Sequence, residues 1–258
     1  YDETRTGGSL RLGRQFGSRW NAYIPLRAES VALSDIDADA PVDYFEAEDE
    51  SVLSSVGLHF TRSSLDNQTF PSEGNRIDFG ADQFGLVGDY TFTKLDASYA
   101  VYFKLAEDVL GRTTAIQFNT RVGYIPGDTD AAPFFERFYL GGQNFRGFNY
   151  RAIAPVGLRA DGSLSDDTVG GNFLFFAGLE LRKPIFDEIL SGVLFIDTGT
   201  VDEDVAFDKY RVAVGAGLRV YVPQVSPVPL AFDFGFPILK EDTDETRVFT
   251  FSVDLPFR

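Results

Sequence analysis

The sequence predicts an all-β fold, a transmembrane antiparallel β-barrel, and three observations lead to that prediction. Apolar and polar residues alternate over segments of about ten residues or more, as in strands that face lipid on one side and a polar lumen on the other. No run of about eighteen apolar residues occurs, which excludes a transmembrane helix but not membrane-spanning strands. The connections differ in length, as do the short periplasmic turns and longer extracellular loops of outer-membrane barrels.

Six predicted strands occupy the first half of the chain. They cover about residues 3–15, 19–33, 51–64, 75–87, 90–105 and 113–125. The tight connections among them, at 17–18, 67–74 and 106–112, are typical of the periplasmic side. The long connection 34–50 is then expected on the extracellular side.

Five more strands follow the long segment 126–171, at about 172–184, 191–202, 209–222, 229–239 and 247–257. The last has the clearest alternation, because five apolar residues share one of its faces: Phe249, Phe251, Val253, Leu255 and Phe257. A membrane barrel turns such a face to lipid. A soluble β-sandwich, the structural alternative, would bury it against a second sheet.

The odd number of strands indicates that the barrel is incomplete in this sequence. Bacterial single-chain barrels normally have an even number of strands with both chain ends in the periplasm. An open sheet edge in lipid would leave backbone groups unpaired at a high cost in free energy. We therefore expect residues 1–258 to be the C-terminal portion of one barrel domain, with the first strands lying outside this chain.

Charge and composition exclude several other functions. The net charge of −16 argues against a nucleic-acid partner, which would require clustered Lys and Arg. The acidic stretches fall between predicted strands and are typical of solvated loops: 35–50, 161–167, 202–208 and 241–245. With no Cys in the chain, neither disulfides nor Cys-based metal or redox sites can form.

Nothing in the sequence favours an enzyme, a metal site or a cofactor site. The sole histidine, His59, lies on the predicted lumen face of its strand, and no Gly-x-Ser-x-Gly motif accompanies it. Walker, dinucleotide-binding and calcium-loop motifs are also missing from the sequence. We predict that His59 is a hydrogen-bonded structural residue and that the chain has no catalytic residue.

The long segment 126–171 contains the most informative motif of the chain. Gly141-Gly142 precedes a core made of Phe145, Arg146, Gly147 and Phe148. This core resembles the Val-Arg-Gly-Phe signature of BamA-type outer-membrane assembly proteins, the bacterial surface antigen family, with Phe145 in place of the usual Val. In that family the signature forms the tip of the sixth extracellular loop.

A second match lies in the predicted turn between residues 66 and 74. Asp66, Phe70, Pro71 and Gly74 are similar to the family's Asp-x-x-x-Phe-Pro-Thr-x-Gly periplasmic turn. Pro71 restricts φ and Gly74 permits a positive φ, as a tight turn requires.

Two strands after the long loop provide further matches. Gly178, Glu180 and Arg182 lie in a segment that resembles the family's Gly-x-Glu-x-Arg-x-Pro strand. The next strand resembles its Phe-x-Asp-x-Gly strand through Phe195 and Asp197. Period two places each set on one side of its strand, so that both sets can face the lumen. Residues 215–219, 229–230 and 233–237 also look like the family's penultimate strands.

The resemblance implies a specific contact inside the barrel. In the family, the loop-tip Arg folds back into the lumen and contacts the acidic strand residues. Here that implies Arg146 paired with Glu180 and Asp197, its side chain against Phe195, while Gly147 lets the backbone turn. Two carboxylates around one planar guanidinium suit its paired donors.

The resemblance also implies a fold, a location and a function. The family's barrel has sixteen strands, so this chain would hold the last eleven, without the N-terminal POTRA domains. Family members fold and insert other barrels into the outer membrane of Gram-negative bacteria, pairing a client's β-signal strand at a lateral seam. Implied partners are outer-membrane lipids and lipopolysaccharide, unfolded outer-membrane protein clients and accessory outer-membrane subunits, with no cofactor. The alternating face from Phe249 to Phe257 resembles such a β-signal.

Two other functions remain open at this stage. Within the family, a two-partner secretion transporter or a TamA-like factor shares the same loop and would move or assemble a different client. Outside it, a passive porin would keep an open lumen with no loop folded within it. The position of the loop therefore distinguishes a passive porin from the functions that the family resemblance implies.

Overall fold

The computed structural model describes residues 1–128, 131–187, 189–222 and 228–253. Within them, eleven strands form one sheet, and each pairs antiparallel with its neighbour in chain order. These strands are β1 (Asp2–Phe16), β2 (Trp20–Ser34), β3 (Asp49–Ser63), β4 (Gly74–Phe84), β5 (Thr93–Glu107), β6 (Thr113–Tyr124), β10 (Phe173–Phe186), β11 (Leu190–Asp202), β12 (Arg211–Val220), β13 (Leu230–Leu239) and β15 (Phe249–Val253).

The remaining elements are short and belong to the connections between these strands. They are α1 (Val42–Glu46), η2 (Phe134–Glu136), β7 (Gly147–Phe148), β8 (Val156–Leu158), β9 (Leu164–Thr168) and β14 (Thr246–Arg247). β8 pairs with β9 in a hairpin, and β7 pairs with β14. Among the described residues, no helix has the length and apolar character needed to cross a membrane.

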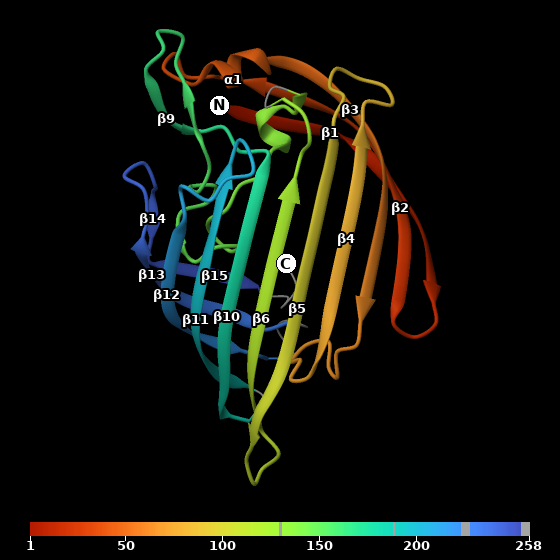
Figure 1. Cartoon of the computed structure of the whole chain (residues 1–258), viewed down its shortest axis with the longest axis vertical. Helices are drawn as coiled ribbons and strands as arrows, with labels where there is room; N and C mark the ends of the chain where they lie inside the picture. Colours follow the sequence, from red (N-terminus) through yellow and green to blue (C-terminus); the bar gives the residue numbers. More distant parts are fainter. Residues whose placement is uncertain (129–130, 188, 223–227, 254–258) are drawn as a thin grey trace.

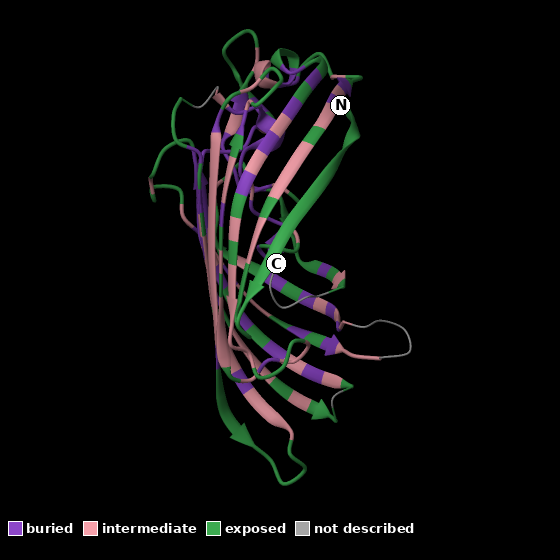
Figure 2. Cartoon of the chain, turned by 90° about the vertical axis from the view of Figure 1, so that its right-hand side faces the viewer, coloured by how far each residue is buried: buried purple, intermediate pink, exposed green. Residues whose placement is uncertain are grey.

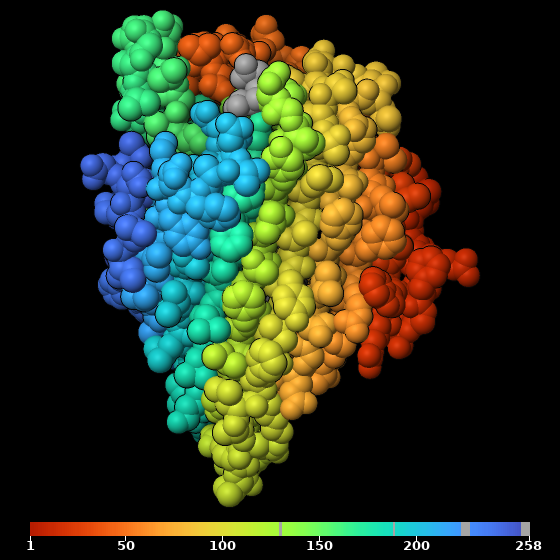
Figure 3. All heavy atoms as spheres, viewed as in Figure 1, coloured from red at the N-terminus to blue at the C-terminus, as the bar shows by residue number. Residues whose placement is uncertain are grey.

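The sheet is strongly curved, and its longer connections gather at one end (Figure 1). The strands run side by side along its outer face (Figure 3). We call β1–β6 the N-terminal wall and β10–β15 the C-terminal wall. β1 and β15 form the two edges of the sheet in the part of the chain that the structure describes.

The two faces of the sheet have opposite chemistry, as the alternating sequence predicted. Large apolar side chains are exposed on the outer face, including Leu58, Phe60, Ile77, Phe79, Leu179, Leu194, Ile196, Phe234, Phe249 and Phe251. Their chain neighbours on the inner face are polar, for example Glu180, Asp197 and Asp233. Buried and exposed residues alternate along the strands of the C-terminal wall (Figure 2). A lipid-facing surface explains this arrangement, because water would not favour so large an exposed apolar area.

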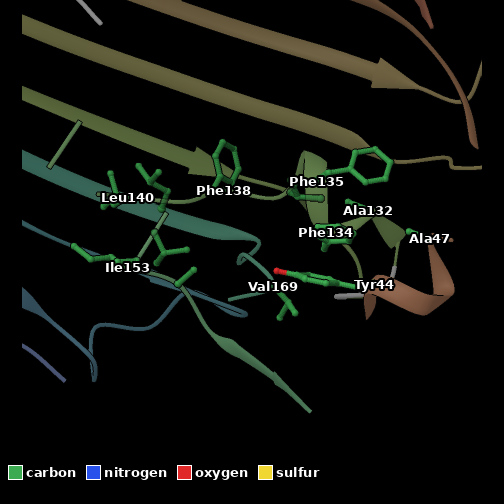
Figure 4. Close-up of a cluster of buried hydrophobic side chains, with 14 of the residues drawn as sticks. Tyr44, Ala47, Ala132, Phe134, Phe135, Phe138, Leu140, Ile153 and Val169 are labelled. Carbon is green, nitrogen blue, oxygen red and sulfur yellow. The ribbon is translucent and has the colours of Figure 1, made fainter. Parts of the chain in front are cut away.

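The buried core lies inside the curve of the sheet, at the end where the long connections gather. The described residues of the segments 125–128 and 131–172 fold inward and pack their aromatic side chains against the inner face. Figure 4 shows Phe138, Leu140 and Ile153 along the sheet and Phe134 beside Tyr44 of α1, with the last two ring centroids 4.3 Å apart. The inside of the sheet is therefore filled by loop rather than by a second sheet, and the β-sandwich alternative does not apply.

The predicted all-β fold and its eleven strands are confirmed, and two details of the strand bounds were wrong. The strands predicted at 75–87 and 90–105 are separated by a longer connection, since Gly85 and Gly88 take φ values of 96° and 126° that interrupt the ladder. The strand predicted at 247–257 is divided: β14 pairs with β7 outside the main sheet, and only β15 joins that sheet. Leu255 and Phe257 lie outside the described residues.

Candidate functional site

Arg146 lies inside the sheet and binds two carboxylates of the C-terminal wall. Its Nε and Nη2 each lie 2.7 Å from an oxygen of Asp197, on β11. Its Nη1 lies 2.6 Å from Glu180 Oε2, on β10. The backbone N–H of Arg146 also donates to Asp197, at 3.1 Å. The guanidinium therefore makes a bidentate pair with one carboxylate and a single bond with the other.

An aromatic ring completes the surroundings of this cation. The guanidinium carbon lies 3.5 Å from the centroid of the Phe195 ring, a close cation–π contact. Phe195 stands directly opposite Glu180 in the ladder, so that both side chains point inward. We call Arg146, Glu180, Phe195 and Asp197 the tip cluster. The structure thus brings together the four residues that the resemblance grouped.

The residues flanking Arg146 shape the loop tip. Phe145 and Phe148 are fully buried, and their rings meet edge to face with centroids 5.1 Å apart. Gly147 has a φ of 93°, a conformation that favours glycine. A Cβ on Gly147 would lie 3.2 Å from the carbonyl carbon of Gly235 on β13. The tip backbone therefore rests directly on the sheet.

The tip cluster extends to an ion pair that the sequence prediction missed. Arg219 Nη2, on β12, lies 3.0 Å from Glu180 Oε2, and its Nη1 lies 2.7 Å from Asp233 Oδ1 on β13. Arg219 and Asp233 belong to strand segments that had been matched to the family, but no pairing was predicted for them. Their inward parity in the alternating pattern was the signal that could have identified them.

A second cluster of charges holds the base of the same loop. Glu136, at the end of η2, has a side chain only 7% exposed. Its Oε1 lies 2.7 Å from Arg27 Nη2 on β2 and 3.1 Å from Arg5 Nη1 on β1. Its backbone carbonyl accepts a hydrogen bond from Lys94 Nζ, on β5, at 2.6 Å. We call Glu136, Arg5, Arg27 and Lys94 the base cluster, which the sequence prediction also missed.

The charge balance of the base cluster is visible in the ionisation of its carboxylate. Burial alone would raise the pKa of Glu136, but the positive charges of Lys94, Arg27 and Arg5 outweigh it and hold that pKa below its ordinary value of 4.5. Glu136 is therefore the charged partner of three cations on the N-terminal wall.

The predicted periplasmic turn reaches across the inside of the sheet. Asp66 accepts hydrogen bonds from the backbone N–H groups of Ser72 and Glu73, at 2.9 and 3.1 Å. Although burial opposes ionisation, these bonds and one from the Ser72 hydroxyl hold the pKa of Asp66 below its ordinary value. Gly74 has a φ of 100°, as the motif requires.

Contacts with the far wall distinguish this segment from an ordinary turn. Arg182 Nη2, on β10, donates to the Pro71 carbonyl at 2.7 Å. The Phe70 ring meets that of Tyr221, after β12, edge to face at 4.9 Å. The turn between β3 and β4 thus bridges to the C-terminal wall below the tip cluster.

His59 is hydrogen-bonded, as predicted. Its Nε2 lies 2.9 Å from Asp82 Oδ2 on the neighbouring strand β4, and its ring lies 5.0 Å from that of Tyr23. A Cβ on Gly80 would lie 2.8 Å from the His59 ring, so the glycine leaves room for it. Within the described residues, no group of three or more His, Asp or Glu side chains is arranged to hold a metal ion.

An outward apolar face, a polar interior and a long loop clamped inside it define the class of protein: a transmembrane β-barrel whose lumen is occupied by its own loop. Comparison with known proteins identifies the family. The model of the Omp85 superfamily domain matches residues 1–257, and the chain belongs to the Omp85 superfamily. The resemblance predicted from the motifs is confirmed, and the chain is an outer-membrane protein of the Gram-negative type.

Two curated relatives carry the name outer membrane protein assembly factor BamA. The protein from Nitratidesulfovibrio vulgaris is 30% identical over 252 residues, which cover 92% of this chain. The protein from Neorickettsia risticii is 25% identical over 235 residues, or 87% of this chain. The chain spans 30% of the length of each of these relatives.

Two solved structures share the fold. The crystal structure of BamA from Haemophilus ducreyi lacking POTRA domains 1–3 superposes with a TM-score of 0.80, at 20% identity, over 96% of this chain and 53% of that one. CdiB from Acinetobacter baumannii superposes with a TM-score of 0.59, at 16% identity, over 97% of this chain and 42% of that one. The transmembrane antiparallel barrel is thus the shared architecture.

Proposed function

We propose that this chain forms part of the barrel of an outer-membrane protein assembly factor, which folds and inserts other β-barrels into the outer membrane. The observation that carries the proposal is the alignment of 92% of the chain with a relative of that name at 30% identity. The occupied lumen supports it, because a loop clamped at both its base and its tip argues against a passive porin.

The mechanism that we propose is noncovalent strand pairing at a seam. β15 is the last described strand, and its ladder with β13 runs over five residue pairs. An edge strand exposes unpaired N–H and C=O groups that can template an incoming strand. A client's β-signal strand would pair at such an edge and be released into the membrane as its own barrel closes. No covalent chemistry, and so no catalytic residue or cofactor, is required.

The partners follow from this mechanism and from the two faces of the sheet. Unfolded outer-membrane proteins would be the clients, and accessory outer-membrane subunits would deliver or hold them. The exposed apolar side chains of the outer face suit the acyl chains of outer-membrane lipids and lipopolysaccharide. The tip cluster would hold the inner loop in place and take no chemical part.

Two-partner secretion is the second candidate, and the shared fold with CdiB favours keeping it. A secretion transporter would move an unfolded passenger through the lumen, which requires the inner loop to leave. Both functions use the same barrel and loop. They differ in the final location of the client, which is the membrane in assembly and the far side of the membrane in secretion.

Reconstitution separates the two candidates. The full-length protein is reconstituted in liposomes, and an unfolded outer-membrane barrel or an unfolded secretion passenger is added outside. Assembly predicts that the barrel client becomes heat-resistant and membrane-embedded faster than in empty liposomes. A passenger that becomes protease-protected inside the vesicles, with no acceleration of barrel folding, would establish secretion and refute the assembly proposal.

A further inference from the structure

The tip of the inner loop is joined by backbone pairing to the segment that leads into the last described strand. β7 pairs antiparallel with β14, with Gly147 opposite Arg247 and Phe148 opposite Thr246. The pairing continues at Asn149, whose N–H donates to the Glu245 carbonyl at 2.9 Å. Asn149 Nδ2 also donates to Glu245 Oε2, at 2.9 Å. The loop tip is therefore a short extra strand beside β14.

The segment that carries β14 is fixed just before this bridge. Arg211, at the start of β12, makes a bidentate pair with Asp244, at 2.9 and 2.8 Å. The two side chains are 2% and 1% exposed. Such a buried, doubly bonded pair holds its segment in one position. Residues 245–247 therefore start from the fixed position of Asp244 and pair with the loop tip.

After β14 the chain returns to the sheet beside the loop tip. The N–H of Gly235 donates to the Val248 carbonyl at 2.8 Å, and the regular β13–β15 ladder begins at the next pair, Phe234 with Phe249. A Cβ on Gly235 would lie 2.5 Å from the Gly147 nitrogen, so the tip also sits on β13 at this level. One short region thus contains the loop tip, the start of β15 and the strand that pairs with it.

We infer that the loop tip is a positioning element for the last strand: the β7–β14 bridge, with Asn149 and Glu245 at its end, holds the extracellular end of β15 against β13. Docking of Arg146 and anchoring of β15 are then coupled. Release of the tip cluster removes the bridge, and β15 keeps only its five ladder pairs. The functional reading, that the loop controls when the seam strand can part, rests on the proposed assembly function.

Hydrogen exchange tests the coupling without any client. The full-length protein is placed in nanodiscs, and hydrogen exchange of the backbone amides of residues 249–253 is followed by mass spectrometry. Arg146→Ala should raise their exchange at least about tenfold, because loss of the bridge lowers the free energy of local opening. The amides of β2 and β3 should keep their wild-type protection.

Two further variants test the bridge itself. Asn149→Pro removes the N–H that donates to Glu245 and leaves the tip cluster intact, and it should also raise exchange at 249–253. Asn149→Cys/Glu245→Cys, made in the Arg146→Ala background of this cysteine-free chain, should restore protection of 249–253 when oxidised and lose it again when reduced.

The outcomes are distinguishable from those of the assembly test. Wild-type exchange at 249–253 in both Arg146→Ala and Asn149→Pro, or a disulfide that restores nothing, overturns the positioning role. Increased exchange together with unimpaired folding of a barrel client would keep the coupling and remove its proposed use in assembly. Gly192→Ala serves as the control, since its added Cβ meets only the flexible end of Ile185 at 3.3 Å.

Discussion

The inner loop is held at two places, and the two differ in sign and in exposure. At the tip, one cation, Arg146, sits between carboxylates, and Asp197 is only 2% exposed. At the base, the loop contributes one anion, Glu136, to three strand cations whose side chains are 24–32% exposed, and two of these, Arg5 and Arg27, also pair with Glu29. Loss of Arg146 would leave the buried Asp197 without its bidentate partner, whereas the partly exposed cations at the base can turn to solvent or to Glu29. We therefore expect the tip cluster to hold the loop more strongly.

Arg146→Ala gives the largest expected effect. It leaves the buried Asp197 without its bidentate partner, while Glu180 keeps only Arg219, which should cost about 3–5 kcal/mol and release the tip. Heat resistance of the barrel on gels and the rate of client folding should both fall. Arg159→Ala is the matched control, an arginine of the same loop whose acidic partner Asp166 is fully exposed, at 101%, and whose other bonds go to the backbone carbonyls of Asp39 and Leu164. Unchanged heat resistance and client folding in Arg146→Ala would contradict the role given to the tip cluster.

Glu136→Gln tests the weaker half of the comparison. The amide can still accept hydrogen bonds but no longer places a negative charge beside Arg27, Arg5 and Lys94, and of these the two arginines keep Glu29. Because these cations are partly exposed, we expect a cost of about 1–2 kcal/mol, smaller than at the tip. The midpoint of thermal unfolding would measure it. A loss equal to that of Arg146→Ala would show that the two clusters anchor the loop equally.

The ionisation of Glu136 predicts a pH dependence of the stability. Its pKa in the fold lies below the ordinary value of 4.5. The stabilisation is therefore fully present above about pH 4.5 and is lost as the pH falls through the lowered pKa of the folded state. Thermal unfolding followed below pH 5 should show a decline that is reduced in Glu136→Gln. A parallel decline in both proteins would assign the acid sensitivity to other carboxylates.

Asp66→Ala is expected to have the smallest effect. It removes the acceptor for Ser72 and Glu73 and should loosen the turn that reaches Arg182, at a cost of about 1 kcal/mol. Increased hydrogen exchange of residues 67–74, with the loop tip unaffected, is the expected result. Asp161→Ala offers a matched control, because Asp161 accepts equivalent bonds from Ser163 in the exposed β8–β9 hairpin. If both variants behave alike, the contact with the far wall adds nothing to the turn.

The two clusters also show which contacts a sequence can reveal. The positions of the strands could be predicted from period-two alternation, because residues that face lipid alternate with residues that face the lumen. Arg146, Glu180 and Asp197 were found through local motifs. Glu136 lies in an aromatic segment, and its cationic partners lie on β1, β2 and β5. No local sequence pattern links an acid to cations so far back in the chain.

The course of the last strand is another feature that alternation could not predict. The alternation of apolar and polar residues from Phe249 onward has no interruption near residue 247, so it indicates one unbroken strand. In the structure, Thr246 and Arg247 pair with the loop tip instead of β13. Competition between two possible partners for the same backbone is a tertiary effect, and the choice depends on where Gly147 and Gly235 bring the chains together.

The order of charges along the inner loop bears on how this barrel reaches its own folded state. Arg146 lies 34 and 51 residues from Glu180 and Asp197, whereas Glu136 lies 42 residues from Lys94 but 109 and 131 residues from Arg27 and Arg5. Since closing longer chain segments costs more entropy, the hairpin that follows the loop and Lys94 before it can contact the loop before Arg27 and Arg5 complete the base cluster. A loop inserted the other way round would set cation against cation and acid against acid. The charge order thus acts as a check on loop orientation while the sheet curls around it.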